Sequence, residues 1–140
     1  MADILLNSFK INEYDGGYKF IEHRRQTQQV RDKLDETGQS IHHFVEQHAQ
    51  NINRWGNQAI NSTRNSMPLD SKIHQAISNL QNTAARNIDG MKHMNFSHLY
   101  EYVTQLPWEA QYRWGLTMTQ YALSHNGDMS RFNPTNFGLL

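Results

Sequence analysis

The sequence predicts an all-α protein of four to five helices with an irregular N-terminal arm and a C-terminal tail. The prediction rests on apolar side chains that recur every three, four or seven residues, because these spacings place them on one face of an α-helix. Such rows occupy three stretches of the chain, residues 18–64, 69–91 and 96–123. A length of 140 residues also matches the size of one domain.

The first stretch contains a row of side chains spaced by seven positions. Its members are Phe20, Thr27, Leu34, Ile41, His48 and Trp55. The row passes through Gly38 without a change of phase, and two interpretations remain open. A single helix over residues 18–64 would be about 65–70 Å long and would need a partner helix to cover it. Alternatively, a first helix ends near Thr37 and Ser40 caps a second one.

The later helices have clearer boundaries. Residues 69–91 form the cleanest apolar stripe, and Gly90 is a stop signal at its end. A shorter helical region follows. Pro107 suits the first turn of the last helix, because a residue at that position needs no N–H donor. Asn126 and Gly127 are residue types that commonly end a helix.

The two ends of the chain lack a helical pattern. Asp15, Gly16 and Gly17 form a turn signal near the N-terminus. The C-terminal end keeps bulky side chains such as Phe132 and Phe137, which disordered segments rarely contain, and we therefore expect it to dock. The resulting division is an arm or short hairpin at residues 1–17, a helical domain at 18–126 and a C-terminal docking tail at 127–140.

Composition restricts the partners and the location. The chain has 13 basic and 13 acidic residues with no basic stripe, so nucleic acid is an unlikely partner. No apolar run approaches the roughly 18 residues that a membrane span requires. The first residues lack a basic region followed by a long apolar run, which argues against secretion by a signal peptide. We expect a cytoplasmic or virion location.

The histidines are the main source of candidate chemistry. On a helix, His42, His43 and Glu46 would face one side, where they form a weak candidate for a metal site. Gln47 stands where a zinc-protease motif would need its second histidine. The chain has no cysteine, no phosphate-binding loop and no nucleophile-elbow motif. The sequence therefore predicts no enzyme activity, no cofactor and no firm metal site.

The remaining features favour a protein that assembles with other proteins. Asn and Gln together occupy 26 positions, and amides form polar contacts without the desolvation cost of a charge. We expect a structural or assembly subunit, with a viral or phage virion component as one form of it. The alternatives are an adaptor or inhibitor that occludes one target, and a nucleic-acid-binding accessory factor. The candidate interface residues are Phe20, Leu34, Ile41, Phe44, His48, Trp55, Phe132 and Phe137.

Overall fold

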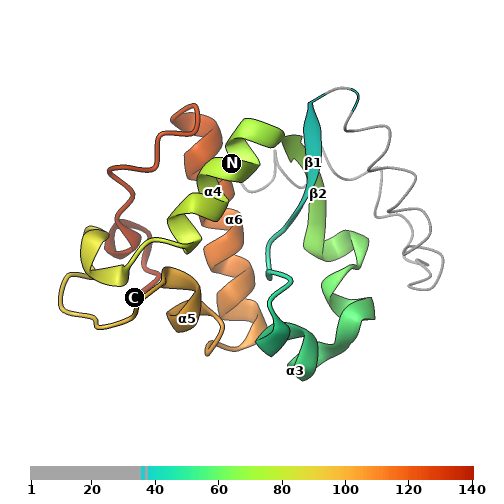
Figure 1. The fold of residues 1–140 in the computed structure, drawn as a ribbon, viewed down its shortest axis with the longest axis horizontal. Helices are drawn as coiled ribbons and strands as arrows, with labels where there is room; N and C mark the ends of the chain where they lie inside the picture. The colour runs from blue at the N-terminus through green and yellow to red at the C-terminus, as the bar shows by residue number, and fades with distance from the viewer. Residues whose placement is uncertain (1–35, 37) are drawn as a thin grey trace. The chain divides into compact units, whose positions relative to one another are not determined.

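A computed structural model describes residue 36 and residues 38–140 of the chain. Its helices and strands, labelled as in Figure 1, are β1 (Gln39–His43), α3 (Ala49–Ile60), β2 (Ser66–Asp70), α4 (Ser71–Gln81), α5 (Leu99–Val103) and α6 (Trp108–Ser124). Short 3₁₀ turns lie at Thr63–Asn65, Ala85–Asn87 and Pro134–Phe137. The chain divides into two compact units, one ending at Ser71 and the other spanning Lys72–Leu140.

The prediction of an all-α fold is wrong, because the first unit contains a two-stranded antiparallel sheet. β1 and β2 pair in a register that places Gln39 opposite Asp70 and His43 opposite Ser66. The described residues therefore form a mixed fold of four helices and one small sheet. The chain between the strands contains α3, which Figure 1 shows below the sheet.

The continuous helix over residues 18–64 is also wrong. Gly38 has a φ of +75°, a left-handed conformation that a right-handed helix does not contain. The residues after it are extended in β1, so the alternative of a second helix capped by Ser40 is wrong as well, and α3 begins at Ala49. Within α3, Gly56 is again non-helical, with φ 86° and ψ 159°. The described members of the seven-residue row lie in different kinds of structure, since Ile41 is in β1, His48 is in the extended link and Trp55 is in α3.

A buried asparagine holds the extended link between β1 and α3 in place. The Asn65 Oδ1 accepts the Val45 N–H at 2.8 Å, and its Nδ2 donates to the Val45 and Ile60 carbonyl oxygens at 2.9 and 2.8 Å. These bonds satisfy backbone groups that neither helix nor sheet satisfies, as burial requires. Phe44 and Val45 are buried at 2% and 0% exposure.

The second unit begins with a helix that is shorter than predicted. α4 ends at Gln81, while the predicted stripe continued to Met91. The side chains of Asn82 and Thr83 donate to the carbonyl oxygens of Ser78 and Asn79, at 3.0 and 2.8 Å. Because the last carbonyls of a helix have no partner within it, these bonds terminate α4. Leu69, the first residue of the predicted stripe, lies in β2, and α4 begins at Ser71.

The last helix agrees with its prediction. α6 begins directly after Pro107, and the chain leaves it through Asn126 and Gly127, both with positive φ. The Gly127 N–H donates to the Ala122 carbonyl oxygen at 2.8 Å. Among the described helices, none is both long enough and apolar enough to cross a membrane.

Candidate interaction site in the C-terminal unit

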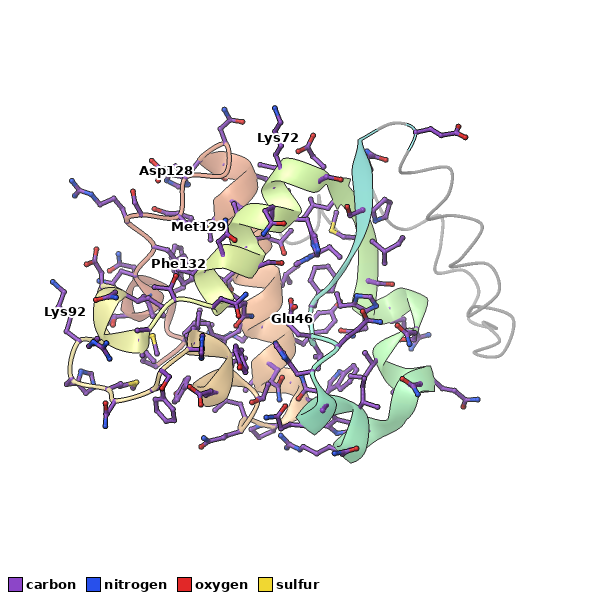
Figure 2. All side chains as sticks on the ribbon, in the orientation of Figure 1. Glu46, Lys72, Lys92, Asp128, Met129 and Phe132 are labelled. Atoms are coloured by element: carbon purple, nitrogen blue, oxygen red, sulfur yellow. The ribbon has the colours of Figure 1, made fainter. Side chains whose placement is uncertain are left out.

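A groove of about 300 Å³ lies within the second unit. The last turns of α4, the turn after it and the segment that follows α6 form its walls, and Figure 2 labels Met129 and Phe132 on that segment. The lining residues are Ala76, Asn79, Leu80, Thr83, Asn87, Ile88, Gly127, Met129, Ser130 and Phe132. None of these side chains is ionisable at neutral pH, so the groove itself carries no charge.

The groove combines buried apolar side chains with polar ones. Its buried apolar members are Leu80, Ile88, Met129 and Phe132. Its polar side chains are amides and hydroxyls from Asn79, Thr83, Asn87 and Ser130. This mixture suits a neutral ligand that has an apolar part and hydrogen-bonding groups.

Two of the hydroxyls are already oriented by the protein. The Ser130 hydroxyl donates to the Asp128 carboxylate at 2.7 Å, and the Ser130 N–H donates to the same oxygen at 3.0 Å. These two bonds hold the pKa of Asp128 below its usual range. The Thr83 hydroxyl donates to the Asn79 carbonyl oxygen at 2.8 Å. Each hydroxyl oxygen still has lone pairs with which to accept a bond from a ligand.

Phe132 connects the groove to an aromatic cluster beside it. Its ring lies edge-on to Tyr121, with centroids 5.2 Å apart, and tilted against Trp114 at 6.4 Å. On another side it stacks with Phe137 at 5.7 Å and an interplanar angle of 14°. Phe132 is 1% exposed, whereas Phe137 is 39% exposed. The sequence had singled out both residues, and the structure brings them together with Phe137 on the surface.

Several contacts hold the C-terminal segment on its own unit. The Asn133 Oδ1 accepts the Thr135 N–H at 3.0 Å. Gly90 packs against these two side chains so closely that an added Cβ would collide with Asn133 Oδ1 and Thr135 Oγ1. The Arg113 guanidinium donates to the Phe137 carbonyl oxygen at 3.3 Å. The position of the segment is therefore set by residues from distant parts of the chain.

The other predicted interface residues do not share a helix face. Ile41 is half-buried in β1, His48 lies in the extended link before α3, and burial lowers the pKa of His48. Phe44 is buried.

Trp55 is half-buried in α3, with the Arg54 guanidinium 4.1 Å from its ring centre. Two further candidates, Phe20 and Leu34, lie outside the described residues.

The predicted metal candidates also lose their helical geometry. His42 and His43 are neighbours in a strand, where successive side chains point to opposite faces. The His43 Nε2 makes a hydrogen bond of 3.0 Å with the Asn61 Oδ1. Glu46 lies in the link before α3 (Figure 2), and burial raises its pKa to about 7. In the part of the chain that the structure describes, no group of three or more His, Asp or Glu side chains is placed to hold a metal.

Sequence reasoning missed most of the groove. Asn79, Thr83 and Asn87 look like ordinary exposed polar residues, and Met129 and Ser130 follow the last helix without a pattern. The available signal was the retention of bulky apolar residues after Gly127, which indicated docking without showing where.

The described residues form a small mixed α/β fold with an uncharged, partly apolar groove as the candidate binding site. Comparison with family models, with curated proteins and with solved structures finds no match to this chain. The chemistry of the groove therefore has to be inferred from its own residues.

Proposed function

We propose that this protein is a non-enzymatic structural or assembly subunit that binds other protein chains through the groove and the neighbouring Phe137. The observation that supports this most is the uncharged groove, which adjoins an exposed aromatic side chain through Phe132. The centres of protein interfaces are depleted in charged residues and enriched in aromatic ones. A few aromatic side chains often supply most of the binding energy.

The groove also indicates the chemistry of the contact. An apolar side chain of a partner would lie against Met129 and Phe132, while its backbone would hydrogen-bond to Asn87 and Ser130. A charged group would lose its hydration there without gaining an opposite charge from the lining residues, which is unfavourable. The groove therefore favours a neutral, partly apolar segment of a protein over a nucleic-acid phosphate.

The substitution Ala76→Arg tests this proposal, because it places a charge in the groove from a half-buried position on α4. Gln105→Arg is the matched control, since it adds the same charge at an exposed position outside the groove. We expect the full-length protein to self-associate in sedimentation velocity experiments, and only Ala76→Arg to weaken that association. An equal effect of both variants would contradict a role for the groove.

An adaptor or inhibitor that occludes one target is the second candidate. The size of the groove favours it, because about 300 Å³ accommodates one or two side chains of a single bound segment. A wild-type chain that remains monomeric at every concentration would overturn self-assembly and favour this alternative.

A further inference from the structure

The hydrogen bonds of the small sheet define which backbone groups face outward. The Phe44 N–H donates to the Asn65 carbonyl oxygen, and the Ser71 N–H donates to the Gly38 carbonyl oxygen, both at 2.9 Å. In an antiparallel ladder, hydrogen-bonded pairs alternate with pairs that exchange no bonds. The hydrogen-bonded pairs are therefore Gly38–Ser71, Ser40–Leu69, His42–Met67 and Phe44–Asn65.

The two edges of this sheet consequently differ. The backbone N–H and C=O groups of Gln39 and Ile41 point away from β2, and they make no hydrogen bond on that side to any described residue. On the opposite edge, the residue facing Ile41 is Pro68, which has no N–H to offer. A proline at the outward position of a strand prevents further strands from pairing there. β1 thus presents a usable edge, and Pro68 blocks the middle of the edge of β2.

We propose that β1 pairs antiparallel with β1 of a second copy of this chain, an inference that rests on the proposed assembly function. The register is centred on Ser40. Gln39 of each copy then lies opposite Ile41 of the other, and the two residues exchange both N–H···O bonds. This register gives four backbone hydrogen bonds between the copies and uses only Gln39 and Ile41. The strand order of the joined sheet is β2–β1–β1–β2.

The side chains of β1 suit a second copy as the partner. The strand reads Gln-Ser-Ile-His-His and contains no Asp, Glu, Lys or Arg, so self-pairing places no like charges opposite each other. Ser40 would face Ser40 across the two-fold axis, where its small side chain permits the close approach of a pair without hydrogen bonds. A charged partner strand would gain no ion pair from these residues. The partner strand that fits β1 best is therefore an uncharged one, and β1 of a second copy meets this condition.

The blocked edge limits how far this pairing extends. Because each β1 edge is used once and each β2 edge carries Pro68, the association closes at two copies. The sheet thus forms a symmetric pair, and larger assemblies require a different surface, such as the groove of the second unit.

The substitution Ile41→Pro tests the edge directly in the full-length protein. It removes an N–H that points away from β2, as Pro68 already does on the other strand, so the β1–β2 ladder retains its bonds. Ile41→Thr is the control, because it alters the side chain but keeps the N–H. With the groove blocked by Ala76→Arg, we expect light scattering to report a dimer for the otherwise unchanged chain and for Ile41→Thr. Ile41→Pro should raise the dimer dissociation constant by about tenfold or more, because two of the four bonds are lost.

Hydrogen exchange provides a second measurement that needs no variant. The Gln39 and Ile41 amides should exchange more slowly as the wild-type concentration rises through the dimer dissociation constant, with little change at exposed Gln105. Exchange at these two amides that is independent of concentration would overturn the edge pairing.

The outcomes separate this inference from the proposed function. A dimer that is weakened by Ala76→Arg and unaffected by Ile41→Pro would overturn the edge pairing and leave the assembly function in place. A monomeric wild type that Ile41→Pro destabilises would show that the edge is covered within one chain, which also overturns the pairing. A dimer disrupted by Ile41→Pro alone would support the edge and remove the groove as the self-association surface.

Discussion

At the scale of single residues, Glu46 is the described side chain whose pKa is raised clearly by its surroundings. The residue is half-buried in the link between β1 and α3, yet desolvation of its carboxyl raises its pKa from 4.5 to about 7. Burial favours the neutral acid because a charge loses its hydration in an apolar environment. Near neutral pH, this side chain is therefore a mixture of acid and carboxylate.

This pKa leads to a prediction about stability. The Glu46 carboxyl binds a proton more tightly in the folded protein than in the unfolded chain. Its contribution to the free energy of unfolding is therefore complete below pH 4.5 and is lost as the pH rises through about 7. Glu46→Gln should flatten that decline and raise the free energy of unfolding at pH 8 by roughly 2 kcal/mol. Urea denaturation between pH 5 and pH 8 measures the free energy of unfolding, and substitution of the exposed Glu109 (Glu109→Gln) is the control.

A steeper decline in the variant than in the wild type would contradict the assignment. His48 and His74 act in the opposite direction, because burial lowers the pKa of each and their contribution is lost as the pH falls. Comparison of the variant with the wild type cancels this contribution.

At the scale of secondary-structure elements, one side chain links the strand, the extended segment and the helix of the first unit. Asn65 is fully buried and hydrogen-bonds to backbone atoms of Val45 and Ile60. The bonds to Val45 span 20 residues, and the bond to Ile60 reaches back five residues to the end of α3. The amide thus substitutes for the regular backbone pairing that the link between β1 and α3 lacks.

Asn65→Ala should therefore be among the more damaging single substitutions in the first unit. It leaves one buried N–H and two buried carbonyl groups without their partner, and we expect a loss of about 3 kcal/mol or more. Asn82→Ala is the matched control, because exposed Asn82 makes one side-chain bond, to Ser78. Urea denaturation followed by circular dichroism should separate the two variants, and equal losses would refute the structural role of Asn65.

The elements also show what could be predicted from the sequence. α6 was predicted closely, because Pro107, a long apolar stripe and Asn126-Gly127 all indicate the same helix. β1 was missed because five residues with apolar and polar side chains fit a strand and a helical row equally well. The choice between them depends on Pro68 and its neighbours, which pair with β1 from more than twenty residues away. Such long-range pairing overrides local periodicity.

At the scale of the whole molecule, association depends on which surfaces remain available after folding. The candidate groove could not be predicted from sequence, because its walls come from α4 and from the segment after α6. Docking of that segment depends on Gly90, whose lack of a side chain admits Asn133. No periodic pattern links these residues, so a single sequence contains no signal for their proximity.

The blocked edge of the sheet predicts how a substitution would change the size of the assembly. Pro68→Thr supplies an outward N–H on β2 and so makes the second edge available for pairing. If copies pair through β1, this variant should form species larger than a dimer, and their proportion should grow with concentration. Sedimentation velocity measures the distribution, and a variant that stays dimeric would show that Pro68 does not limit association.

The packing of Phe132 has a consequence for how the second unit forms during translation. All of α4 and α6 leaves the ribosome before Phe132, which contacts both Trp114 and Tyr121. Until Phe132 follows, the faces of these two rings that it covers remain exposed to water. Domains generally fold as units while they are synthesised, so this unit completes its core only after residues 128–137 emerge. A nascent chain stalled before that point would expose the aromatic faces of Trp114 and Tyr121 that Phe132 covers in the finished protein, and such a surface favours aggregation.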